Sequence, residues 1–171
     1  MDDYDKIPLE TALRARPSLS GVILRLPMTF GPGDRQRRFR WLLGPMIKGA
    51  ATFSLDPQWA HWRTTYGYVE NVADALAAAA VHTATPGLIF NIGEQNAPDH
   101  REWVRRFSHT LDWTGSVDLA PAPRGSPLDA LDLRYSMATD TTAFREAFGW
   151  SEPVQLDTAL QRTAADEKSK S

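Results

Sequence analysis

Residues 21–34, GVILRLPMTFGPGD, decide the fold of this chain. The apolar run at 22–26 alternates too little for a strand with one solvated face, and its limits at Gly21 and Pro27 are too close for a helix. A strand buried on both faces is typical of a parallel sheet covered by helices. Ligands bind beyond the carboxyl ends of such strands, so we expect residues 27–34 to form a loop at a binding site.

Strand and helix patterns alternate on both sides of this stretch. We expect helices at residues 4–15, 39–47, 70–82, 141–148 and 156–166, another helix capped by Asp99 and ending near Leu111, and strands at 52–55, 64–68 and 88–92. No repeat or low-complexity linker divides the chain. We therefore expect a single α/β domain over residues 1–166, followed by a disordered tail at 167–171.

The composition excludes several classes of site. The chain has 171 residues and no cysteine, which excludes disulfides, thiolate metal sites and cysteine nucleophiles. His82, His100 and His109 lack metal-ligand spacing, so we expect no metal site and place all three on the surface. His61 lies between Trp59 and Trp62, a pattern that favours an edge-packed aromatic cluster over a substrate pocket.

Charge and hydropathy indicate which partners to expect. Nineteen basic and 21 acidic residues give a net charge of -2, which does not favour nucleic acid or an anionic membrane. The N-terminal sequence MDDYDK is acidic where a signal peptide is basic, and the apolar run at 75–81 is too short to span a bilayer. We expect a cytoplasmic protein with no membrane and no nucleic-acid partner.

Four segments, in order, resemble the extended short-chain dehydrogenase/reductase proteins, also called the NAD-dependent epimerase/dehydratase family. They are LRLP with FGPGD at 24–34, YGYVENVADA at 66–75, FNIG at 90–93, and Asp140 with FGW at 148–150 and Pro153. These segments resemble the part of the family that follows the catalytic helix. The resemblance implies a parallel Rossmann-like sheet and an NAD or NADP cofactor.

The glycine-rich turn of that family, Gly-x-x-Gly-x-x-Gly, which binds the dinucleotide pyrophosphate, does not occur in the sequence. We therefore expect the C-terminal part of a Rossmann-like sheet plus the small α/β substrate lobe, with the N-terminal nucleotide-binding half absent, as in a truncated product. Strands without their neighbours expose an apolar edge, so we also expect self-association.

The family's chemistry uses a Tyr-x-x-x-Lys pair on one helix face, in which the lysine lowers the tyrosine pKa and the tyrosine transfers a proton. By resemblance Lys6, with Glu10 four residues later, matches the lysine. Asp2 occupies the tyrosine position, and Tyr4, two residues before Lys6, points about 200° around the helix from it. Either Tyr4 reaches the site from a frayed helix start, or the acid/base is missing and both residues belong to an ordinary amphipathic N-terminus.

The resemblance also implies contacts with cofactor and substrate. Lys6 would contact the cofactor, and Pro27 and Met28 would lie beside the nicotinamide; alternatively, Pro27 simply ends a strand. Arg63 or Arg134 would meet the diphosphate of a nucleotide sugar. The arginines at 35, 37, 38 and 40 also suit phosphate, with Arg38 the candidate for substrate, although a solvated helix face is the favoured interpretation.

Two functions remain open. The first is an NAD(P)-dependent epimerase, dehydratase or reductase acting on a sugar nucleotide or a related hydroxyl or carbonyl substrate. The second is a catalytically inactive remnant that serves as a binding or interaction module. Cofactor binding distinguishes them.

Overall fold

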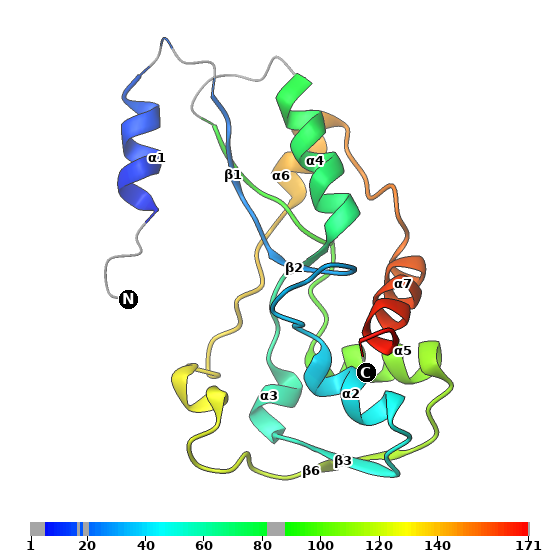
Figure 1. Ribbon diagram of the computed structural model, residues 1–171. Coiled ribbons are helices and arrows are strands. Elements are labelled where there is room, and N and C mark those ends of the chain that lie inside the picture. Colours follow the sequence, from blue (N-terminus) through cyan, green and yellow to red (C-terminus); the bar gives the residue numbers. More distant parts are fainter. Residues whose placement is uncertain (1–5, 17, 19–20, 82–87, 171) are drawn as a thin grey trace.

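The computed structural model describes residues 6–16, 18, 21–81 and 88–170, in which helices alternate with short strands (Figure 1). In chain order the elements are α1 (Ile7–Arg14), β1 (Ile23–Arg25), β2 (Met28–Phe30), α2 (Arg40–Ile47), β3 (Thr52–Leu55), α3 (Pro57–His61), β4 (Tyr66–Tyr68), α4 (Val69–Val81), β5 (Ile89–Asn91), α5 (His100–Leu111), β6 (Ser116–Leu119), the 3-10 helix η1 (Pro127–Ala130), α6 (Thr142–Phe148) and α7 (Leu156–Lys168).

The strands form parallel pairs. Ile23 of β1 lies opposite Ile89 of β5, Met28 of β2 opposite Tyr66 of β4, and β3 pairs with β6. These pairings confirm the α/β class and the parallel strands that the sequence predicts.

Four elements were not predicted: β2, β6, α3 and the 3-10 helix η1. Residues 28–30, expected within a loop, form β2 because their backbone pairs with β4. Strand β6 is likewise defined by its pairing with β3. Helix α3 begins where the Asp56 carboxylate accepts hydrogen bonds from the backbone N–H groups of Gln58 and Trp59, with Pro57 at the first helical position.

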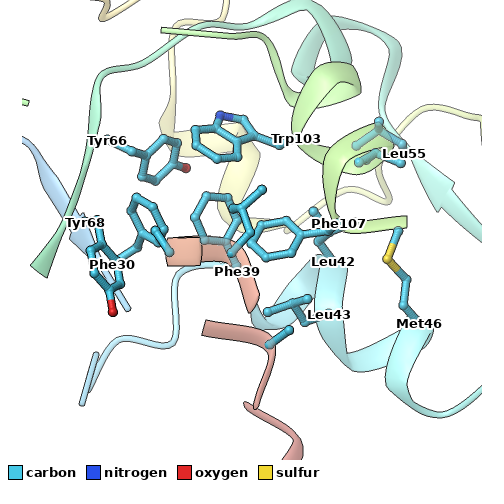
Figure 2. Close-up of a cluster of buried hydrophobic side chains, with 14 of the residues drawn as sticks. Phe30, Phe39, Leu42, Leu43, Met46, Leu55, Tyr66, Tyr68, Trp103 and Phe107 are labelled. Atoms are coloured by element: carbon cyan, nitrogen blue, oxygen red, sulfur yellow. The ribbon is translucent and has the colours of Figure 1, made fainter. Parts of the chain in front are cut away.

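An aromatic cluster forms the larger core (Figure 2). Phe30 of β2 packs edge-on against Phe39 with ring centroids 5.3 Å apart, and against Trp103 of α5 at 5.8 Å. Tyr66 and Phe107 complete the group around Phe39. Offset and edge-on ring pairs add to the free energy of burial, so this core fixes β2 against α2 and α5.

A second core joins α4, β5 and α6. Phe90 of β5 contacts Phe144 and Phe148 of α6, and Trp150 packs on Phe144. The Trp150 indole N–H donates to Asp74 of α4 at 2.7 Å. The FGW segment that resembles the family's closing motif therefore fastens α6 to the strand pair β1–β5.

Helix α7 extends beyond its predicted end at residue 166. Glu167 lies in its last turn, is buried, and forms an ion pair with Arg37, which lies 130 residues earlier. The prediction that the tail is disordered from residue 167 is thus wrong for residues 167 and 168, because a distant cation holds the helix end in place.

Candidate functional site

The strand that carries the LRLP motif changes partner at Leu26 and Pro27. The N–H of Ile92 donates to the carbonyl of Arg25 at 3.1 Å, which ends the contact with β5, and the N–H of Met28 donates to the carbonyl of Thr65 at 3.3 Å, which begins the contact with β4. Pro27 has no N–H and cannot join either ladder. The change leaves Pro27 and Met28 at the carboxyl end of β1, the kind of position where α/β sheets bind ligands.

Two glycines make room for Pro27. A Cβ at Gly67 would lie 2.6 Å from the Pro27 Cγ, and one at Gly93 would lie 3.2 Å from the Pro27 Cβ. A Cβ at Gly93 would also lie 2.5 Å from a Thr65 methyl, so neither glycine position has room for a side chain. Pro27 therefore packs closely against Gly67 of β4 and against Gly93, which follows β5.

A hollow of about 270 Å³ lies beyond the carboxyl end of β2. Its walls are Thr29, Phe30, Arg38, Val69 and the loop residues 31–36. Gly31 has φ +126°, and a Cβ there would lie 2.8 Å from the Tyr68 ring and 2.9 Å from a Val69 methyl. Only glycine fits this turn, which allows the loop to leave β2 sharply and enclose the hollow.

Asp34 organises the loop around the hollow. Its carboxylate accepts the backbone N–H groups of Gln36 at 3.0 Å and Arg38 at 2.9 Å, and one N–H of the Arg38 guanidinium at 2.7 Å. Arg38 Nη1 also donates to the Thr29 carbonyl at 2.7 Å. Asp34 was not among the sequence candidates. An Asp in a turn is nevertheless a known signal, because its carboxylate can accept the backbone N–H two residues later.

The four arginines at 35–40 do not share one helix face, contrary to the favoured interpretation. Arg35, Arg37 and Arg38 precede α2, and only Arg40 belongs to that helix. Arg38 and Arg35 line the hollow, whereas Arg37 turns to Glu167. Arg38 is held at the hollow by Asp34 and Thr29, and its contact with substrate stays a prediction.

A larger open groove, of about 850 Å³, lies between residues of α1 and β1. Figure 1 shows α1 at one side of the molecule, next to β1. Lys6, Ile7 and Leu9 line one wall, and residues 23–26 line the other. Glu10 and Arg25 join the walls by two hydrogen bonds, and the guanidinium of Arg25 lowers the pKa of Glu10. Tyr4, the candidate acid/base, lies outside the described residues, so its place relative to Lys6 stays a prediction.

The other two candidate arginines lie on neighbouring segments. The N–H of Met137 donates to the Arg63 carbonyl at 2.8 Å, which places residues 134–137 beside Arg63. Arg63 Nε donates to the Ala97 carbonyl at 2.7 Å, and Arg134 pairs with Asp132. Neither arginine lines the hollow that Arg38 helps to form. The structure places Arg63 and Arg134 on adjacent segments, and neither side chain reaches the hollow that Arg38 lines.

His100 is buried, contrary to the surface position expected from sequence. Its ring stacks on Trp59 with centroids 4.0 Å apart, its Nδ1 contacts the Trp59 carbonyl at 3.0 Å, and its Nε2 lies 3.4 Å from the Tyr66 hydroxyl. Burial lowers the pKa of His100 to about 4 and raises the pKa of Tyr66 to about 12. The aromatic cluster predicted around His61 is thus built on His100, and His61 itself is exposed.

Glu94 is a buried acid that the sequence analysis missed. Its Oε1 accepts the N–H of Tyr68 at 3.1 Å and the side-chain amide of Asn71 at 3.4 Å, so it ties the end of β5 to β4. Burial raises its pKa. Beside it, Glu152 pairs with Arg145, which also donates to the Gly93 carbonyl at 2.8 Å. These contacts hold the chain turn behind Pro27 and do not open onto the hollow.

Across the ranges 6–16, 18, 21–81 and 88–170, no helix combines the length and apolar character that a membrane crossing needs. Within those same ranges, no three His, Asp or Glu side chains gather as they would around a metal ion.

No protein-family model matches the chain. The uncharacterized protein y4nL of Sinorhizobium fredii is 24% identical over 186 residues, covering 92% of this chain and 51% of that protein. The chain therefore spans about half the length of the curated relative it matches.

The chain also matches about half the length of several solved structures with a similar fold. UDP-glucose 4-epimerase of Thermotoga maritima, in complex with UDP-glucose, has a TM-score of 0.73 at 21% identity, covering 96% of this chain and 52% of its own. UDP-glucuronic acid 4-epimerase of Bacillus cereus, in complex with UDP-glucuronic acid and NAD, gives 0.73 at 16% identity, with coverage of 96% and 50%. RMD from Pseudomonas aeruginosa, in complex with NADPH, gives 0.73 at 12%, with 97% and 54%. The chain thus has the fold of the C-terminal half of these Rossmann-like enzymes.

Proposed function

We propose that this chain forms the substrate-binding half of an NAD(P)-dependent epimerase, dehydratase or reductase whose substrate is a nucleotide sugar. The observation that carries the proposal is the hollow beyond the carboxyl end of β2, with Arg35 and Arg38 in its lining. The UDP-sugars bound by the structurally similar epimerases support this choice of substrate.

The arginines supply the chemistry that a nucleotide diphosphate needs. Guanidinium groups match pairs of phosphate oxygens and keep their charge at every physiological pH. Asp34 and the Thr29 carbonyl hold Arg38 in one orientation, so little side-chain entropy is lost when a phosphate binds. Arg35 is exposed at the rim of the hollow. The resemblance implies that Arg63 or Arg134 meets the diphosphate, but neither lines this hollow, so we propose that one of the two contacts a part of the substrate beyond it.

Lys6, Pro27 and Met28 suit the nicotinamide end of a dinucleotide better than its pyrophosphate. Lys6 lines the groove beside β1, and the fixed Pro27 and the following Met28 close the end of that strand. The glycine-rich pyrophosphate turn does not occur in the sequence. When bound, the dinucleotide takes up and returns a hydride. Lys6 would hold its ribose and lower the pKa of Tyr4, which would exchange a proton with the substrate oxygen.

A binding or interaction module without catalysis is the second candidate. The tyrosine spacing favours it, because Asp2 occupies the position four residues before Lys6 that the family's tyrosine fills. Titration with NADH and NADPH separates the two candidates. Saturable quenching of tryptophan fluorescence that weakens in Lys6→Met supports an enzyme half, and no binding at millimolar dinucleotide supports the module.

Calorimetric titration with UDP-glucose tests the substrate proposal. We expect saturable binding that weakens about tenfold in Arg35→Gln and in Arg38→Gln, the loss of one charge-assisted hydrogen bond each. Arg35→Gln is the cleaner variant, because Arg38 also supports the loop. Arg105→Gln, an exposed arginine on α5, is the matched control and should leave the affinity unchanged. Equal affinities in all four proteins would contradict the proposal.

A further inference from the structure

Arg37 joins the loop at the hollow to the far end of the chain. Its Nη2 and Nε donate to the two carboxylate oxygens of Glu167, the Nε contact measuring 3.1 Å. Glu167 lies in the last turn of α7, which packs against α2 and α5, and its side chain is 7% exposed. The bidentate pair is thus a partly buried, charge-assisted contact between loop and helix, in which the carboxylate is more shielded from water than the guanidinium.

The backbone at Arg37 explains why the loop needs this contact. Its φ is +47°, a left-handed conformation that costs free energy in a residue with a side chain. The conformation sends consecutive side chains to different partners: Arg37 to Glu167 on α7, and Arg38 to the Thr29 carbonyl at the hollow. The Arg37 N–H donates to the Asp34 carbonyl at 3.1 Å and the Arg37 carbonyl accepts the N–H of Arg40 at 2.8 Å, and the ion pair with Glu167 adds a side-chain contact that stabilises the same turn.

Asp34 alone does not fix the loop in space. Its hydrogen bonds to Gln36 and Arg38 shape the turn from within, while Arg38 ties the turn to Thr29 of β2 and Arg37 ties it to α7. Internal shape and external anchorage together determine where Arg35 and Arg38 face the hollow.

We propose that Glu167 and Arg37 are a positioning pair, which holds the loop at residues 31–38 in the shape that binds the nucleotide diphosphate. This inference rests on the proposed function. It makes the end of α7 a determinant of ligand affinity, although no residue of α7 contacts the hollow.

Two measurements on Glu167→Gln test the pair. Trypsin cleavage after Arg35, Arg37 and Arg38, followed by mass spectrometry, reports how often the loop opens without any ligand. Calorimetry with UDP-glucose reports the affinity. Glu167→Asp keeps the charge and serves as the conservative rescue. Asp157→Asn removes an exposed carboxylate from the first turn of the same helix and serves as the control.

We expect Glu167→Gln to raise the loop cleavage rate and weaken UDP-glucose binding, each about tenfold, at a temperature where every variant is folded. Glu167→Asp should recover part of both effects, and Asp157→Asn should show neither. Cleavage and affinity unchanged in Glu167→Gln, or changed equally in Asp157→Asn, would overturn the inference. If the unaltered protein does not bind UDP-glucose, the proposed function fails, while the cleavage rates still decide whether the pair holds the loop.

Discussion

Glu10 and Arg25 bridge α1 to β1 through two hydrogen bonds of 2.8 and 2.7 Å. Helix α1 has no buried residue, and this pair joins the helix to the strand. The ion pair therefore bridges the groove that contains Lys6.

Replacing Glu10 by Gln should release α1 without unfolding the protein. Hydrogen exchange measured by mass spectrometry should show faster exchange over Ile7–Arg14 and unchanged exchange in α5. The pKa of Glu10 is lowered in the folded protein, so the contact is fully present above the ordinary carboxyl range and is lost as pH falls through the lowered value. Acidification of the unaltered protein should reproduce the variant. Equal exchange in both proteins at neutral pH would refute the prediction.

His100 should make stability fall in mild acid. Its pKa is lowered to about 4 from an ordinary 6.5, so between these values the unfolded chain binds the proton that the folded protein excludes. The free energy of unfolding should drop by about 3 kcal/mol between pH 7 and 4 from this residue. Urea unfolding of the unaltered protein and of His100→Gln over this range is the measurement. A variant with the same pH slope as the unaltered protein would show that another group is responsible.

Gly31 should tolerate alanine much less well than Gly33. Both have positive φ, +126° and +82°, but a Cβ at Gly31 meets Tyr68 and Val69 while one at Gly33 meets open space. Gly33→Ala should cost about 1 kcal/mol from backbone strain, and Gly31→Ala about 2 to 4 kcal/mol with the added clash. Thermal or urea unfolding compares them. Equal losses of unfolding free energy in the two variants would contradict tight packing of Gly31 against Tyr68 and Val69.

Self-association is expected through the groove between α1 and β1. Ile7 and Leu9 are each 64% exposed and Leu26 is 54% exposed on its walls. Leu26→Asp should shift sedimentation at micromolar concentration toward the monomer. Leu119→Asp, at an equally exposed leucine on β6, should not. A monodisperse monomer in the unaltered protein would rule out association through this face.

Local signals in the sequence predict the elements that local physics determines. Asp99 accepts the N–H of Glu102 at 2.9 Å and begins α5 as its capping pattern indicates, and Gly149 ends α6 with φ +57°. The strand at residues 52–55 likewise has the predicted limits.

Features that depend on distant partners escaped prediction. Strand β2 exists because residues 28–30 pair with β4, and β6 exists because it pairs with β3. His100 is buried because Trp59, from another helix, stacks on it. Glu167 is ordered because Arg37 reaches it across 130 residues. The two partners of each such pair lie far apart in the sequence, so no short stretch of it contains both.

The candidate site also combines features that local sequence predicts with features that depend on distant partners. The position of Pro27 and Met28 beyond β1 follows from a local motif, and so does the turn at Gly31. The separation of Arg38 from Arg63 and Arg134 follows from which walls the tertiary fold brings together, which the sequence spacing does not contain.

The most direct test of the central claim is a titration of isotope-labelled protein with UDP-glucose, followed through backbone amide signals by NMR. We expect saturable shifts concentrated at Thr29, Val69 and the loop residues 31–38, with the signals of the exposed helix face around Arg105 unchanged. Saturable shifts elsewhere, or no shifts at millimolar UDP-glucose, would contradict the assignment of this hollow as the nucleotide-sugar site.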